Sequence, residues 1–222
     1  MSLVETDWLE NNKDKVKIID CSWHMPQTKR NGFEEYKTQH IPESIFFDLD
    51  DNSDKNTNLP HMLVNKNEWE KIVSKMGIKN EDMIIIYDNS DVVSSCRCWF
   101  NFIYYGHDPK LVHVLNGGLK KWMEEKRKVT NNLSKVMKSD YKSFENQELV
   151  KNKDSINQNI ETQNFRVVDA RSKERFEGKV PEPREGLKSG SIKNSVCIPF
   201  GSCLNQDRTC LLYTSDAADE LL

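Results

Sequence analysis

Short apolar runs that alternate with helical patterns constrain the fold of this chain most. Four runs have the length of a buried strand: VKIID (16–20), SIFFDL (44–49), MIIIYD (83–88) and LVHVLN (111–116). Each run is followed by a segment with apolar residues at helical spacing, and these segments are 32–40, 67–78, 94–107 and 117–126. Strands that alternate with helices form a parallel sheet covered by helices. The sequence therefore predicts an α/β fold with a parallel sheet.

Part of this pattern recurs later in the chain. FRVVDARS (165–172) matches VKIIDCSW (16–23), so that Asp169 takes the place of Asp20. SIKNSVCIPF (191–200) then matches HIPESIFFDL at nearly the same interval. Two matched blocks at similar separation indicate an internal duplication more strongly than either block alone. We therefore expect two copies of one α/β domain.

The composition divides the chain into four parts. Residues 1–126 hold the complete strand–helix alternation, and residues 127–163 are polar and rich in Asn and Lys, which is typical of an interdomain linker with one short helix. Residues 164–209 hold the second copy, which carries only the first two strand patterns. Residues 210–222, CLLYTSDAADELL, resemble translated sequencing-adapter tails, and we expect a non-native end there.

The charge balance excludes several classes of partner. Charged residues make up 30% of the chain and hydrophobic residues 36%, and the formal net charge is -3. Such a balance argues against nucleic acid or an anionic membrane as a partner. No apolar run approaches the ~18 residues that a membrane span needs. The first ten residues lack the features of a secretory signal, so we expect a cytoplasmic protein.

The cysteine spacing gives no sign of a metal site. The chain has six cysteines and no C-x-x-C pair, and no His stands at zinc-finger spacing from any of them. Without a secretory signal, reduced thiols are the expectation. The six are Cys21, Cys96, Cys98, Cys197, Cys203 and Cys210.

Several motifs resemble those of tandem rhodanese-type sulfurtransferases that act on 3-mercaptopyruvate or thiosulfate. The similarity runs in order over about residues 4–205. In the first copy the motifs are DCSWHMP (20–26), LPHML (59–63), CRCWFNFIYYGH (96–107) and VLNGGLKKW (114–122), and in the second they are VVDARSKERFEG (167–178) and PEPREGLKSG (181–190). The resemblance implies that a cysteine of the second domain takes sulfur from the donor and becomes a persulfide. It then passes the sulfur to a thiol, a thioredoxin-like protein or cyanide. Neither a metal nor an organic cofactor is implied.

The resemblance also implies roles for particular residues. Arg175 and Arg184 match two arginines, nine residues apart, that bind the carboxylate and keto groups of the donor. The alternative is that both are ordinary surface arginines. An arginine after Pro-Glu-Pro favours mercaptopyruvate over thiosulfate. Asp50 and His61 match an auxiliary pair that assists proton transfer, and the alternative is that they only support a domain interface.

The sequence also departs from the family. Asp88 stands where an active loop begins with cysteine, and an aspartate cannot hold a sulfane sulfur. With the first copy as a ruler, the sulfur-carrying loop of the second copy falls near position 239, past Leu222. We therefore expect the nucleophilic cysteine to be absent from this sequence. The alternative is a non-catalytic rhodanese-fold binding module. A related phosphatase would need Cys-x5-Arg, whereas Cys203 and Arg208 are separated by only four residues.

Overall fold

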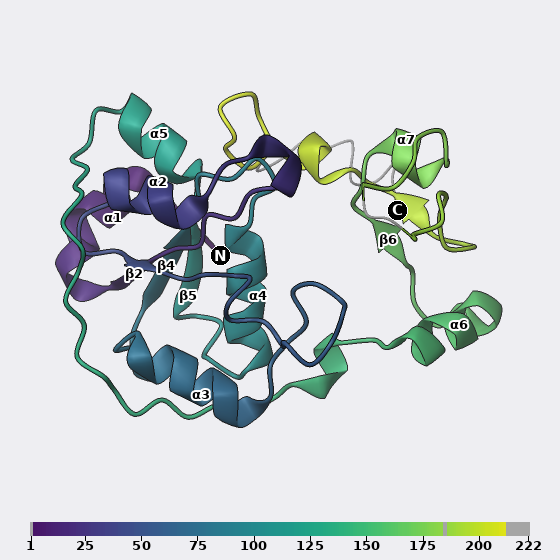
Figure 1. The fold of residues 1–222 in the computed structure, drawn as a ribbon, viewed down its shortest axis with the longest axis horizontal. Coiled ribbons are helices and arrows are strands. Elements are labelled where there is room, and N and C mark those ends of the chain that lie inside the picture. Colours follow the sequence, from purple (N-terminus) through teal and green to yellow (C-terminus); the bar gives the residue numbers. More distant parts are fainter. Residues whose placement is uncertain (1, 184–185, 212–222) are drawn as a thin grey trace. The chain divides into compact units, whose positions relative to one another are not determined.

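The computed structural model describes residues 2–183 and 186–211 (Figure 1). The chain divides into two compact units, Met1–Leu149 and Val150–Leu222. This boundary falls inside the segment 127–163 that the sequence indicates as a linker.

Unit 1 is built on one five-stranded sheet with the order β1-β5-β4-β2-β3, and every pair of neighbouring strands is parallel. Four of the strands lie within the predicted apolar runs, which confirms the α/β fold with a parallel sheet. The first strand is only two residues long, too short to give a periodic signal. The bounds are β1 Leu3–Val4, β2 Lys17–Asp20, β3 Ile45–Phe46, β4 Ile84–Tyr87 and β5 Val112–Leu115.

Helices cover both faces of this sheet (Figure 1). On one side lie α1 and α5, with α2 beside them, and on the other lie α3 and α4. Side chains of a strand alternate between faces, so Ile85 joins the core under α1 and α5 while Ile84 and Ile86 join the core under α3 and α4. The helices are α1 Thr6–Asn12, α2 Gly32–Thr38, α3 Lys66–Lys75, α4 Ser95–Tyr104 and α5 Gly118–Glu124, and short 3-10 turns lie at Lys13–Lys15, Pro26–Thr28 and Gln147–Leu149.

Local sequence explains why α3 begins and ends where it does. The Asn65 side chain accepts a hydrogen bond from the Glu68 amide at 3.1 Å, which caps the first turn. Trp69 and Val73 lie one turn apart and are fully buried against the sheet. Gly77 has a φ of +65°, which ends the helix in the left-handed conformation that glycine adopts without strain.

Residues 127–149 belong to unit 1, in contrast to the linker expected from the sequence. The trace leaves α5 and runs along the side of α3 (Figure 1), where the Ser139 amide donates to the Ser74 carbonyl at 2.9 Å. Tyr141 is fully buried, and its ring stacks on the His107 ring with the centroids 5.8 Å apart. The Tyr141 hydroxyl lies 3.1 Å from Nδ1 of His107. One aromatic anchor in a polar segment leaves no periodic signal, so the burial of Tyr141 could not be predicted from the sequence.

Unit 2 has a two-stranded parallel sheet of β6 and β7. Ordered elements begin with α6, which starts a few residues after the unit boundary. The elements are α6 Lys153–Thr162, β6 Val168–Asp169, α7 Lys173–Phe176, β7 Val196–Cys197 and a 3-10 turn at Phe200–Cys203. Residues 212–222, most of the expected non-native tail, lie outside the described residues.

The strands of the unit 2 sheet pair in the same register as the matching strands of the unit 1 sheet. Asp20 of β2 is opposite Phe46 of β3, and Asp169 of β6 is opposite Cys197 of β7. These are the positions that the two sequence blocks pair. The backbone carbonyl of each aspartate also accepts a hydrogen bond from the residue after its partner, at 2.8 Å in unit 1 and 3.0 Å in unit 2.

The turn before the second strand of each pair has the same conformation as well. Glu43 and Asn194 occupy matched positions and have φ values of +67° and +65°. The next residues, Ser44 and Ser195, each donate an amide hydrogen bond to the carbonyl three residues earlier, both at 3.1 Å. A left-handed turn residue is uncommon outside glycine, so its recurrence at the matched position is informative.

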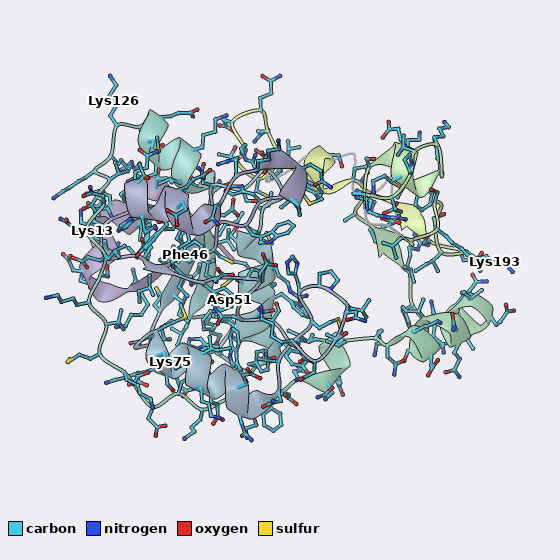
Figure 2. All side chains as sticks on the ribbon, in the orientation of Figure 1. Lys13, Phe46, Asp51, Lys75, Lys126 and Lys193 are labelled. Atoms are coloured by element: carbon cyan, nitrogen blue, oxygen red, sulfur yellow. The ribbon has the colours of Figure 1, made fainter. Side chains whose placement is uncertain are left out.

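Lysine side chains of unit 1 lie at its surface. Lys13 and Lys126 extend outward from it (Figure 2). Lys13 pairs with Glu10 at 2.6 Å, an interaction between neighbouring turns that solvent screens. Within the described part of the chain, the helices are too short or too polar to cross a membrane.

Candidate functional site

The structure brings Asp50 and His61 together. Nε2 of His61 lies 2.9 Å from Oδ1 of Asp50. Because an ionised carboxylate only accepts hydrogen bonds, Nε2 of His61 donates in this contact. Trp23, just after β2, donates its indole N–H to the second oxygen of Asp50 at 2.8 Å. The Trp23 and His61 rings meet edge to face, 4.8 Å apart. An imidazole oriented by a carboxylate in this way can relay a proton.

The exposure of the pair fits such a role. The Asp50 side chain is 63% exposed, whereas the His61 side chain is 18% exposed. The imidazole is therefore held between Trp23 and Asp50 while the site remains reachable from solvent.

Asp88 begins the loop after β4, where the family resemblance implies a cysteine in an active copy. It directly follows β4, and its side chain is buried. One carboxylate oxygen accepts the Ser90 amide at 2.9 Å, and the other accepts the Ser95 amide at 2.8 Å at the start of α4. Backbone N–H groups gathered in a loop favour an anion. Here the side chain of Asp88 itself accepts these amide hydrogen bonds.

A second carboxylate is buried at the neighbouring strand end. Asp20 is 1% exposed, and its Oδ1 accepts the amide and the hydroxyl of Ser22 at 2.9 Å and 2.6 Å. Burial raises the pKa of Asp20 to about 6, although the hydrogen bonds from Ser22 oppose the rise. Asp20 stands in the motif DCSWHMP and anchors the internal repeat, but no functional role was predicted for it.

Asp20 also lines a cavity of about 320 Å³ beside α2. Glu35 stands at the same cavity and accepts Nε and Nη2 of Arg30 at 2.6 Å and 2.7 Å. The Asn89 amide donates to the same carboxylate at 3.1 Å. The Arg30 guanidinium lowers the pKa of Glu35, so the group stays ionised. Glu35 thereby ties the loop after β2 to the loop after β4.

In unit 2, Arg175 is held by a buried carboxylate. Its Nη2 lies 2.5 Å from Oε2 of Glu182, and the Glu182 side chain is only 4% exposed. Arg171 reaches the other oxygen of Glu182 at 2.7 Å and also pairs with Asp169. Arg171 and Glu182 were not predicted as functional residues, although they stand in the motifs VVDARSKERFEG and PEPREGLKSG. Arg184, the other predicted donor-binding arginine, lies outside the described residues.

The cysteines differ in accessibility. Cys21 and Cys98 are fully buried, Cys96 and Cys203 are exposed, and Cys197 and Cys210 are intermediate. Within residues 2–183 and 186–211 none of the six forms a disulfide. Over the same residues no group of three or more His, Cys, Asp or Glu side chains could hold a metal ion.

The family model for a rhodanese-like domain matches residues 5–125, which hold strands β2 to β5 of the parallel sheet and the helices on both of its faces. The chain belongs to the rhodanese family. The mitochondrial thiosulfate/3-mercaptopyruvate sulfurtransferase 1 of Arabidopsis thaliana is 37% identical over 94% of this chain. The human 3-mercaptopyruvate sulfurtransferase is 32% identical over 86% of it.

Solved structures agree in fold. SseA from Escherichia coli, whose structure is described as a rhodanese fold of 3-mercaptopyruvate sulfotransferases, superposes with a TM-score of 0.87 at 26% identity. The match covers 100% of this chain and 82% of the SseA chain. Tum1 from Saccharomyces cerevisiae gives a TM-score of 0.85 at 28% identity, over 95% of this chain and 74% of that one. The chain spans 61% of the Arabidopsis relative and 65% of the human one.

Proposed function

We propose that this chain acts in a sulfurtransferase that moves sulfane sulfur from 3-mercaptopyruvate, and secondarily from thiosulfate, to a thiol or cyanide through a cysteine persulfide. The observation that carries the proposal is the contact between Asp50 and His61, an oriented proton relay in a member of this family. The names of the relatives at 32% and 37% identity support sulfur transfer as the reaction.

The proposed step transfers one sulfur atom from the donor to a cysteine of the enzyme. A cysteine thiolate of the enzyme attacks the sulfur of 3-mercaptopyruvate, and the carbon–sulfur bond breaks as the new sulfur–sulfur bond forms. The carbon keeps the electron pair as the enolate of pyruvate and takes up the proton of the donor thiol, with His61 as the relay. A thiol acceptor then attacks the outer sulfur, and the enzyme thiolate leaves. In our proposal none of the six cysteines of this sequence is the sulfur carrier. Cys21 and Cys98 are buried, Cys96 lies inside α4, no glycine-rich loop follows the other three, and Asp88 occupies the matching loop position of unit 1.

The proposal assigns the donor carboxylate to Arg175 together with Arg184. Glu182 accepts hydrogen bonds from Nε and Nη2 of Arg175. A guanidinium has five N–H donors, so the remaining donors of Arg175 can bind the carboxylate of the sulfur donor. No structural detail is assigned to Arg184, which lies outside the described residues.

The proposal also includes the domain organisation and the setting. Unit 1 is taken as the non-catalytic rhodanese copy and unit 2 as the second copy, supported by the shared register of Asp20 and Asp169. The partners are a small-molecule sulfur donor and a thiol or thioredoxin-like acceptor, in the cytoplasm. Fractionation of the native source tests the location, since the name of the Arabidopsis relative places that protein in mitochondria.

Sulfide release tests the proposed reaction. The protein encoded by the gene of the native source, here called the native gene product, is incubated with 3-mercaptopyruvate and dithiothreitol. Sulfide is then measured against time. We expect turnover with 3-mercaptopyruvate that exceeds turnover with thiosulfate. An absence of sulfide from both donors would refute the proposal and leave the non-catalytic binding module as the reading of this fold.

A further inference from the structure

Arg97 is a half-buried cation next to the Asp50–His61 pair. It lies in α4, the helix that starts at the loop closed by Asp88. Burial lowers the pKa of Arg97, yet an arginine side chain stays charged in proteins. Its Nε is buried and has no acceptor among the described residues. Removing a charged guanidinium from water costs free energy, so its contacts in the protein must compensate for that cost.

The contacts of Arg97 converge on the His61 loop. Its Nη2 donates to the backbone carbonyl of His61, and its guanidinium lies over the Phe100 ring, 5.5 Å from the centroid. A hydrogen bond from a charged donor is roughly twice as strong as one between neutral groups. Arg97 therefore ties the His61 backbone to the rigid start of α4.

The His61 backbone needs such a tie. Its φ is +56°, the left-handed region, which costs a residue with a side chain about 1 kcal/mol or more. In this conformation the imidazole meets both Asp50, at 2.9 Å, and the edge of Trp23. If the carbonyl of His61 were released, the backbone would relax to a more common conformation and carry the ring away from the carboxylate.

We propose that Arg97 is a positioning residue for the proposed sulfur transfer: it holds the His61 carbonyl and thereby keeps the imidazole on Asp50 and Trp23. The inference rests on the proposed function for its catalytic part. The geometric part stands by itself, because it concerns only the orientation of one ring.

Imidazole NMR spectra of the full chain test the geometric part. Arg97→Met keeps the apolar stem and removes the donors. We expect the ring signals of His61, assigned with a His61→Asn variant, to move toward those of an exposed histidine, and Arg97→Lys to restore them in part. The matched control is Arg127→Met, because Arg127 also lies 5.5 Å from an aromatic centroid, that of Trp122. Unchanged His61 signals in Arg97→Met would overturn the inference.

Kinetics of the native gene product test the catalytic part. We expect Arg97→Met to lower kcat about tenfold and to leave the KM for 3-mercaptopyruvate within about twofold, because misplacing a reacting group by about 1 Å lowers the rate strongly. Arg97→Lys should recover part of kcat, and Arg127→Met should match the wild type. A higher KM for 3-mercaptopyruvate with an unchanged kcat would contradict the positioning role. If the wild-type protein released no sulfide, the proposed function would fail, and the NMR spectra would still decide the geometric part.

Discussion

At the scale of single residues, Asp20 shows how the fold opposes ionisation at a strand end. Its pKa rises from 3.8 in an ordinary carboxyl to about 6, because the group is buried. Between these values the folded chain binds a proton more tightly than the unfolded chain. The contribution of the Asp20 carboxyl to the free energy of unfolding is therefore fully present below pH 3.8 and is lost as the pH rises through 6. At neutral pH the loss amounts to about 3 kcal/mol.

Asp20→Asn should therefore stabilise unit 1 at pH 7.5. The amide oxygen can still accept both hydrogen bonds of Ser22, and the neutral side chain avoids the burial penalty. We expect the gain in the free energy of unfolding to shrink as the pH is lowered toward 4. Urea unfolding followed between pH 4 and 8 measures it, with Asp51→Asn, whose side chain is 81% exposed, as the control. A constant difference at every pH would contradict the assignment.

His61→Asn should lower the rate of sulfur transfer about 100-fold, since general acid–base groups contribute about 100- to 10,000-fold. Asp50→Asn should lower it less, because it leaves the imidazole in place without its orienting carboxylate. The double variant should be no slower than His61→Asn alone, since groups that act as one unit are not additive. Steady-state kcat of the native gene product measures all three. An additive loss in the double variant would argue that the two residues act separately.

At the scale of elements, the Tyr141 anchor decides how residues 127–149 join unit 1. Nε2 of His107 donates to the Asp82 carbonyl at 2.9 Å, so the neutral Nδ1 must accept the Tyr141 hydroxyl. Burial lowers the pKa of His107, which keeps the ring in this neutral form. Since the unfolded ring titrates at a higher pH, this contribution is present above about pH 6.5 and is lost as the pH falls below it.

Tyr141→Phe should lower the free energy of unfolding by about 1–3 kcal/mol, because it leaves the buried Nδ1 of His107 without a donor. Amide exchange should quicken at Ser139 and Phe144, whose amides bond to the rest of unit 1. Urea unfolding and hydrogen exchange at pH 7.5 check both effects. Wild-type stability in Tyr141→Phe would show that the hydroxyl contact is dispensable.

Periodicity predicted most of the elements and little of the site. Strands buried on both faces, such as β4, read as apolar runs, and α3 and α4 carry clear helical patterns. The contact between Asp50 and His61 could not come from periodicity, because both lie in a loop whose path depends on tertiary contacts such as that of Arg97. Family resemblance alone marked them. Arg171 and Glu182 escaped because an ion pair across a loop has no spacing rule.

At the scale of the whole molecule, the two units differ in their cores. Among the described residues, all buried hydrophobic side chains lie between Leu9 and Tyr141, within unit 1. Unit 1 therefore has the closed core that independent folding needs. The described part of unit 2 has only the two short strands β6 and β7.

Residues 1–149 should fold cooperatively when expressed alone. Residues 1–126, which end just after the 5–125 match to the family model, should be less stable by about 3–5 kcal/mol, because loss of Tyr141 removes a buried aromatic ring from the core. Urea unfolding followed by circular dichroism compares the two chains. Equal midpoints would show that residues 127–149 act only as a linker, as their composition indicates.

Locating the persulfide tests the proposed sulfur transfer. The native gene product and residues 1–222 are each treated with 3-mercaptopyruvate, alkylated, and mapped by peptide mass spectrometry. We expect the native product to gain the mass of one sulfur atom on a cysteine that is none of the six in residues 1–222, and we expect residues 1–222 to gain none. A persulfide on Cys203 or another of the six, or no persulfide in the native product, would contradict this expectation.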